Sequence, residues 1–202
     1  MSKVTVLTLT YNRAHLLPRA IEHVLSQSFT DFTYLIVDNA STDSTREIIA
    51  NYQKQDSRIQ TIHMPKNFIL HPDFEGNVPV WNQVEQILYQ PADEYHFQLD
   101  DDDYMEKDTL ETLVRLIEDY QADVSVVGSQ WVYQDGSRKD KYVFDGVYTF
   151  NRLQAVTELL KREKFNNAAD GKLSRKSVCD IKLSEKKLTS QVYRQHRTLG
   201  RE

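Results

Sequence analysis

Four consecutive aspartates occupy positions 100–103, directly after the short apolar run at residues 95–99. Carboxylates this close together repel one another, so they need a cation or hydrogen-bond donors nearby. Oxygen ligands suit hard cations, and one interpretation is a divalent ion, Mg²⁺ or Mn²⁺, held by these aspartates. The other is a solvated acidic turn ahead of a helix that begins near Glu106, where negative charge favours the helix N-terminus. The cluster alone leaves both interpretations open.

Strands and helices are expected to alternate on both sides of this cluster. Apolar and β-branched runs predict strands at residues 4–9, 34–37, 58–63, 95–99 and 123–128. Apolar residues at helical spacing predict helices at residues 16–25, 44–52, 80–89, 110–120 and 153–162. The order predicts an α/β fold with a mainly parallel, Rossmann-like sheet flanked by helices.

Local signals refine this outline. Ser44 and Glu47 have the spacing of a capping box. Asp135-Gly136 predicts a small β-hairpin extension between residues 130–133 and 141–144. Residues 64–76 predict a long irregular loop. We interpret Trp81 and Trp131 as core or interface residues rather than stacking platforms.

Polar residues follow three of the predicted strands, at residues 10–13, 38–39 and 100–103. Ligands of such sheets bind beyond the carboxyl ends of the strands, so the three groups are expected to share one cleft. The chain lacks G-x-G-x-x-G after its first strand and has no Walker-type loop, which argues against a dinucleotide or P-loop site. A divalent ion held by the aspartates would instead bridge a diphosphate. His63 and His71 have no ligand spacing and are interpreted as non-metal.

Composition narrows the class of protein. The 202 residues, 40% of them hydrophobic, are enough for one domain with a full core. No apolar stretch has the length of a signal peptide or a membrane span, so we expect a cytoplasmic protein without a transmembrane segment. The single cysteine, Cys179, excludes an intrachain disulfide and a cysteine zinc site. The net charge of −5 argues against non-specific nucleic-acid binding.

Charge is unevenly distributed along the chain. Residues 161–202 hold 12 Lys/Arg against 5 Asp/Glu, whereas residues 1–160 hold 13 against 25. The basic C-terminal part could contact anionic lipid at the inner face of a membrane or a phosphate-bearing acceptor, or form a solvated surface. The oligomeric state, including a homodimer, stays open.

Four motifs occur in order and resemble the GT-A family 2 glycosyltransferases. They lie at residues 4–13, 27–32, 37–45 and 99–104, and residues 171–175 resemble a further family segment. The resemblance covers about the first 180 residues. It implies a GT-A nucleotide-sugar-binding and catalytic domain at residues 1–180, followed at 181–202 by a basic segment, which could be a truncated acceptor region.

The family implies a nucleotide-diphosphate-sugar donor, with a UDP-sugar favoured, and transfer with inversion to a hydroxyl of a glycan or lipid-linked acceptor. Asp102 would hold Mn²⁺ or Mg²⁺, and the metal would absorb charge on the leaving diphosphate. The implied nucleotide-binding residues are Thr10, Tyr11, Arg13, Asp38, Asn39, Asp100 and Asp101.

The chain departs from the family pattern at two places. Asn39 stands where an aspartate is frequent, and no acidic pair follows residues 181–186, where the pattern would supply the catalytic base. Asp170 and Glu185 are the nearest carboxylates in sequence, and the base stays unassigned. Two alternatives follow: a nucleotide-sugar-binding protein without transferase activity, or a nucleotidyltransferase that lacks the usual glycine-rich loop.

Overall fold

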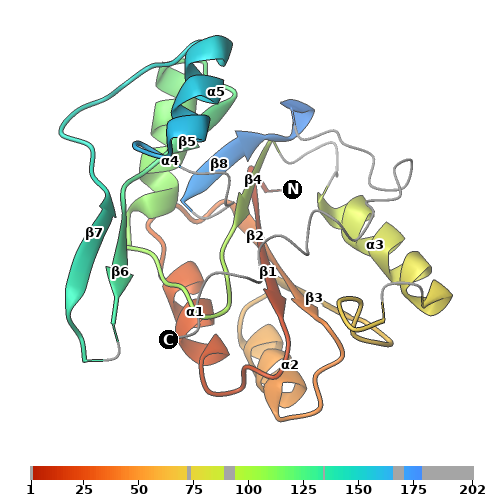
Figure 1. The fold of residues 1–202 in the computed structure, drawn as a ribbon. Helices are drawn as coiled ribbons and strands as arrows, with labels where there is room; N and C mark the ends of the chain where they lie inside the picture. Colours follow the sequence, from red (N-terminus) through yellow and green to blue (C-terminus); the bar gives the residue numbers. More distant parts are fainter. Residues whose placement is uncertain (1, 72–73, 89–93, 134, 166–170, 179–202) are drawn as a thin grey trace.

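The computed structural model describes residues 2–71, 74–88, 94–133, 135–165 and 171–178. A six-stranded sheet runs through the centre in the order β3-β2-β1-β4-β8-β5, with a separate two-stranded hairpin, β6-β7, beside it (Figure 1). The sheet strands are β1 (Val4–Thr10), β2 (Phe32–Asp38), β3 (Ile59–His63), β4 (Tyr95–Gln98), β5 (Val124–Val126) and β8 (Lys172–Arg175). β1 to β4 are parallel, so the predicted α/β fold with a mainly parallel sheet is confirmed.

Helices cover both faces of the sheet, which explains why β1 and β2 are buried almost throughout. On one face, α1 (Leu17–Leu25), α2 (Thr45–Gln55) and α4 (Thr109–Asp119) pack on side chains such as Val6 and Ile36. On the other face, α3 (Val78–Leu88) packs on Leu7, Leu35 and the residues around them. β1, β2 and β3 therefore contribute side chains to two apolar layers.

β8 is the element that sequence patterning did not predict. It lies between β4 and β5 and runs antiparallel to both. Leu173 is its fully buried residue, and polar neighbours surround it in sequence. A single apolar position carries no period-two signal, so pairing with its neighbours, rather than local sequence, makes this segment a strand.

The predicted hairpin consists of β6 (Ser129–Val132) and β7 (Arg138–Tyr142). Ser137 donates from its backbone N–H and its hydroxyl to Asp135 Oδ1, and Gly136 adopts φ 81°, as the Asp-Gly turn requires. At the base of the hairpin, a Cβ on Gly128 would lie 2.8 Å from the carbonyl oxygen of Tyr142. Glycine at position 128 therefore lets the two strands close.

Two local expectations need correction. Ser44 makes no capping bond, because the N–H of Thr45 donates to Asp43 Oδ1 instead. The capping box that does form joins Asn151 and Gln154 at the start of α5 (Arg152–Lys161). Trp131 is 47% exposed rather than in the core, whereas Trp81 packs edge-to-face on Phe68.

Within the described ranges, no helix combines the length and the apolar character needed to cross a bilayer. The predicted basic segment at residues 181–202 lies outside the described residues, as do Asp170 and Cys179.

Candidate active site

The three polar groups predicted to converge lie together at the carboxyl edge of the sheet, meaning the C-terminal ends of β1, β2 and β4. Thr10 and Asp38 are register partners at the ends of β1 and β2. The N–H of Asn39 donates to the carbonyl of Thr10 over 2.8 Å. β4 pairs with β1 on its other side, and the acidic cluster (residues 100–103) follows directly. Parallel pairing thus brings residues about 90 positions apart to one edge.

Asp101 is the buried member of the acidic cluster, with 8% of the residue exposed. Its Oδ1 lies 3.6 Å from Nε of Arg13, so the β1–α1 loop and the acidic cluster are linked by charge. Burial raises the pKa of Asp101, and Asp102 and Asp100 add to that, while Thr10 and Arg13 oppose it. The Thr10 hydroxyl is buried close to Asp101 without a hydrogen bond of normal geometry among the described residues.

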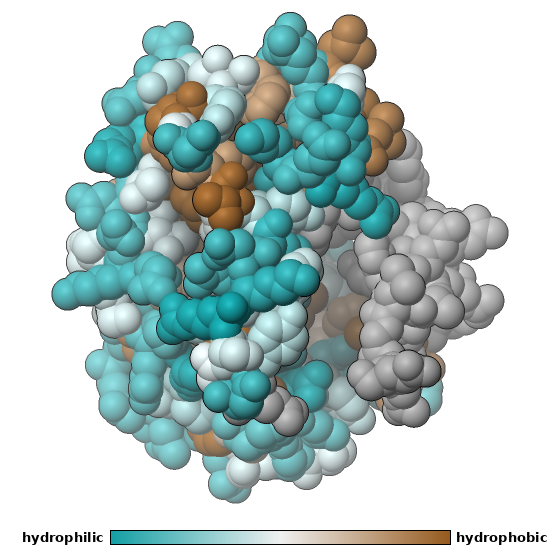
Figure 2. Space-filling view, turned by 60° about the vertical axis from the view of Figure 1, so that its left-hand side comes forward, coloured by the Kyte–Doolittle hydropathy of each residue, from teal (hydrophilic) through white to brown (hydrophobic). Residues whose placement is uncertain are grey.

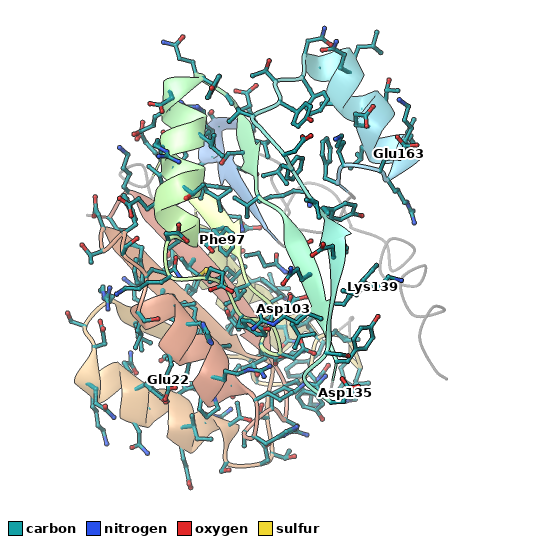
Figure 3. All side chains as sticks on the ribbon, turned by 90° about the vertical axis from the view of Figure 1, so that its left-hand side faces the viewer. Glu22, Phe97, Asp103, Asp135, Lys139 and Glu163 are labelled. Carbon is teal, nitrogen blue, oxygen red and sulfur yellow. The ribbon has the colours of Figure 1, made fainter. Side chains whose placement is uncertain are left out.

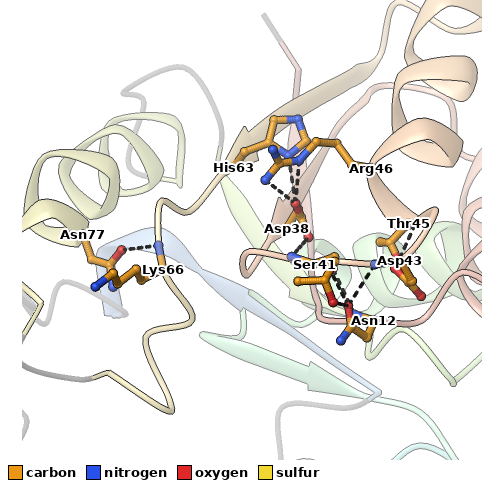
Figure 4. Close-up of polar contacts among 10 residues, drawn as sticks. Asn12, Asp38, Ser41, Asp43, Thr45, Arg46, His63, Lys66 and Asn77 are labelled. Carbon is orange, nitrogen blue, oxygen red and sulfur yellow. Dashed lines mark hydrogen bonds and ion pairs between the residues drawn. The ribbon is translucent and has the colours of Figure 1, made fainter.

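Asp38 is fully buried and its carboxylate is held by three groups (Figure 4). The N–H of Ser41 donates to Oδ1 over 3.0 Å, while Arg46 and His63 reach Oδ2 at 3.2 and 3.1 Å. Burial alone would raise the pKa of Asp38, but these hydrogen bonds outweigh it and hold the pKa below its usual value. Asp38 is therefore a carboxylate whose charge is satisfied inside the protein.

Asn39 ties the edge to the long loop that precedes α3. It is 3% exposed, and its side-chain oxygen accepts the N–H of Phe68 over 2.9 Å. Asn67 in turn accepts the N–H groups of Ile69 and Leu70. The Asn39 side chain thus anchors the loop at residues 64–71 to the end of β2, and the Asn67 side chain stabilises the loop itself.

The β1–α1 and β2–α2 loops interlock through short polar side chains (Figure 4). Asn12 Oδ1 accepts the N–H of Thr42 over 2.8 Å, and the N–H of Asn12 donates to the Ser41 hydroxyl over 2.9 Å. Asn12 and Ala40 have φ of 53° and 64°. Asparagine tolerates this left-handed conformation, but alanine pays a steric cost that the surrounding contacts must offset.

Tyr11, Arg13, Asp100 and Asp102 are the exposed members of the predicted site. Tyr11 is 37% exposed, between the buried Thr10 and the loop contacts of Asn12. The backbone carbonyl of Asp102 accepts a bond of 2.9 Å from Arg19 Nη2. Arg19 also lies over the Tyr104 ring, 5.3 Å from its centroid. The backbone at Asp102 is fixed by these contacts, while its carboxylate faces solvent.

Gln27 fixes the segment that follows the acidic cluster. This buried side chain donates to the carbonyl of Glu106 over 2.8 Å and accepts the N–H of Leu110 over 3.0 Å. The N–H of Ser28 donates to the carbonyl of Lys107 over 2.8 Å. The end of α1 thereby sets the path of the chain between the acidic cluster and α4.

Sequence reasoning assigned no individual role at this edge to several residues that shape it: Asn12, Arg19, Ser41, Asp43, Arg46 and His63. The short polar run at residues 41–45 carried a signal, because Ser, Thr and Asp there favour side-chain bonds to nearby backbone. His63 carried none, since its contact with Asp38 depends on the pairing of β2 with β3. Arg46 carried none either, since its contact with Asp38 depends on how the first turn of α2 folds back on the end of β2.

The chain is similar to known glycosyltransferases. Residues 5–71 match the model of the glycosyl transferase family 2. TuaG of Bacillus subtilis, named as a teichuronic acid biosynthesis glycosyltransferase, is 31% identical over 168 residues, which are 80% of this chain and 63% of TuaG. The chain is thus a relative of the family 2 glycosyltransferases. The resemblance seen in the motifs is confirmed.

Other glycosyltransferases also match. GlyG of Streptococcus pneumoniae is 26% identical over 82% of this chain and 53% of its own length. A GalNAc(5)-diNAcBac-PP-undecaprenol β-1,3-glucosyltransferase of Campylobacter jejuni is 29% identical over 73% of this chain and 44% of its own. The chain therefore spans 44–63% of the length of TuaG and these two relatives.

The fold of this chain is matched in a solved structure. Residues 1–349 of TarS from Staphylococcus aureus superpose with a TM-score of 0.64 at 19% identity, over 91% of this chain and 48% of that one. The predicted GT-A fold is confirmed.

The resemblance to the family implies a metal ion at Asp102. The protein ligands there suit a site that is completed only when the ion binds together with other ligands. Among the described residues, no three His, Cys, Asp or Glu side chains are grouped to hold a metal ion. Mg²⁺ in phosphate-binding sites is often held by one or two carboxylates, with substrate phosphates and water completing the shell. The exposed carboxylates of Asp100 and Asp102 fit that mode, in which the ion arrives with a diphosphate.

Proposed function

We propose that this chain is a glycosyltransferase that binds a nucleotide-diphosphate sugar at the carboxyl edge of the sheet, with a UDP-sugar favoured. The sugar passes with inversion to a hydroxyl of a glycan or lipid-linked acceptor. One observation carries the proposal: the ends of β1, β2 and β4 meet and are joined by the contacts Arg13–Asp101 and Asn39–Thr10. Similarity to family 2 glycosyltransferases supports the same activity.

The roles that we propose for these residues follow from which side chains are exposed to solvent. Asp102 is the carboxylate available to a Mn²⁺ or Mg²⁺ ion, because its backbone is anchored and its side chain faces solvent. Bound there, the ion would neutralise charge that develops on the leaving diphosphate. Tyr11 and Arg13 lie exposed on the β1–α1 loop and would line the nucleoside side.

In this proposal the buried residues Asp38 and Asn39 act through the groups that they bind. Because Asp38 is bonded to Ser41, Arg46 and His63, it would orient those groups toward the nucleotide. Asn39 would act through the Phe68 segment that it anchors. Arg46 is half-exposed, so its guanidinium can keep its bond to Asp38 and still meet an anionic ligand.

The acceptor class is proposed from the relatives. The Campylobacter jejuni protein is named for a lipid-linked, undecaprenol-bearing acceptor, and TuaG for teichuronic acid synthesis. A saccharide on a lipid carrier or in an envelope polymer is the corresponding acceptor here. The general base is left unassigned.

A thermal-shift titration tests the donor site. UDP at about a hundredfold excess over its Kd should raise the melting temperature by about 5 °C or more in Mn²⁺, and less with EDTA. Asp102→Asn should lose the metal-dependent part, because the amide is a weaker ligand than a carboxylate. Asp119→Asn, at the exposed far end of α4, is the matched control and should behave like the wild type.

No shift with UDP, or an identical Mn²⁺ dependence in Asp102→Asn, would count against the proposal.

A further inference from the structure

Trp131, on the β6-β7 hairpin, is an exposed aromatic side chain flanked by two ammonium groups. It is 47% exposed, and the Nζ atoms of Lys139 and Lys141 each lie 5.9 Å from the centroid of its ring. A large aromatic residue left in solvent on a strand gains little from burial, so its contact surface is available to a ligand.

The register of the hairpin places these three side chains on one face. Trp131 pairs with Lys139, and a register shift next to Ser129 and Gln130 brings Lys141 to the same ring. Asp140 pairs with Gln130 on the opposite face, where the Gln130 side chain donates to it over 2.7 Å. The Trp131 face is therefore cationic, and Asp140, which lies between the two lysines on β7, is on the opposite face.

The hairpin also lies next to the acidic cluster. Arg138 Nη1 is 3.9 Å from Oε1 of Glu106, a residue in the segment that Gln27 anchors. Figure 3 shows Asp103 beside the hairpin, with Lys139 pointing away from the sheet. Figure 1 shows the β6-β7 hairpin on the other side of α1 from β1, extending toward the same end of the molecule as the C-terminal ends of β1 and β2, so the Arg138–Glu106 pair is what ties it to the segment after the acidic cluster.

We propose that the Trp131 face of the β6-β7 hairpin binds the sugar acceptor, and that this acceptor is a saccharide carrying carboxylate or phosphate groups. The inference rests on the proposed function and specifies its acceptor. A sugar ring stacks through its C–H groups on Trp131. Lys139 and Lys141, which both reach the same ring, pair with an anionic substituent of the stacked sugar.

Three observations favour a saccharide over an extended polyanion or a bilayer. Nucleic acid would have to pass the acidic cluster at residues 100–103, in a chain of net charge −5. The face that carries the hairpin is largely hydrophilic, with hydrophobic side chains confined to separate patches (Figure 2). Lys139 and Lys141 interrupt the exposed apolar side chains of the hairpin at Trp131, Val132 and Tyr133, so these do not form the continuous apolar face of a membrane-inserting surface.

Saturation-transfer NMR tests the inference with three trisaccharide probes: trigalacturonic acid, phosphorylated maltotriose and neutral maltotriose. The wild type should bind at least one charged probe more tightly than maltotriose, and the two charged probes distinguish carboxylate from phosphate. Trp131→Ala should weaken binding about tenfold, and Lys139→Ala and Lys141→Ala about threefold each. Lys54→Ala and Tyr120→Ala change an exposed cation and an exposed aromatic elsewhere and should leave binding unchanged.

The UDP and Mn²⁺ thermal shift is measured on the same variants. Trp131→Ala should keep that shift, and Asp102→Asn should keep binding of the charged trisaccharide. A normal UDP shift with no charged trisaccharide bound, or with equal binding in the hairpin variants, overturns this inference and leaves the donor site standing. Lysine-dependent binding to phosphatidylglycerol vesicles without trisaccharide binding would overturn it in favour of a lipid surface. Trisaccharide binding without a UDP shift would overturn the proposed function instead.

Discussion

At the scale of single residues, the charges at the carboxyl edge divide into those satisfied by the protein and those left for a ligand. Asp38 is bonded to Ser41, Arg46 and His63, whereas the carboxylate of Asp102 faces solvent. Sequence position alone could not separate them, because both are aspartates after a strand. What separates them is the neighbouring strand: β3 delivers His63 to Asp38.

Asp38→Asn should lower the free energy of unfolding at pH 7 by about 2 kcal/mol, because a buried hydrogen-bonded charge is lost. The pKa of Asp38 is lowered in the folded state, so its stabilising effect is present above the ordinary carboxyl pKa and disappears as pH falls through the lowered value. Urea denaturation should therefore show a constant gap to the wild type from pH 7 to about pH 5, closing below about pH 4.

Asp119→Asn should show no such gap at any of these pH values. A gap for Asp38→Asn that widened on acidification would show that the hydrogen bonds around this carboxylate are not the source of its stabilisation.

At the scale of elements, strands with several apolar positions could be predicted and those with one could not. β1 and β2 have long buried runs, and the hairpin has its Asp-Gly turn. β8 has Leu173 alone, and its place in the sheet depends on partners distant in sequence. Helix ends were harder still: Ser44 and Glu47 had the right spacing, yet Asp43 provides the bond at the start of α2.

Replacing Gln27 tests how the end of α1 positions the segment between the acidic cluster and α4. Gln27→Ala should leave the Leu110 N–H and the Glu106 carbonyl without their partner, at a cost of roughly 2 kcal/mol in the free energy of unfolding. Hydrogen exchange at residues 104–112 should speed up more than hydrogen exchange in the strands of the sheet. Gln53→Ala, which removes an exposed bond to Thr61, is the control and should change neither quantity appreciably.

Uniform acceleration of exchange across the protein in Gln27→Ala would mean that this side chain supports the whole core rather than the segment after the acidic cluster.

At the scale of the whole molecule, the parallel arrangement of β1, β2 and β4 creates the site. The sequence predicted that three polar segments would meet, because each follows a strand whose direction the alternation of strands and helices determines. It could not predict the loop contacts of Asn12, Asn39 and Arg19, which depend on loop geometry. It also missed the exposure of Trp131, because an aromatic residue in a strand pattern usually packs inside.

The central claim is that Asp102 holds a divalent ion through which a nucleotide diphosphate binds at this edge. Anomalous scattering from crystals grown with UDP and Mn²⁺ tests it most directly. We expect a manganese peak roughly 2–2.5 Å from a carboxylate oxygen of Asp102, with the diphosphate on its other side. A bound UDP without manganese at Asp102, or manganese bound away from the ends of β1, β2 and β4, would contradict the claim.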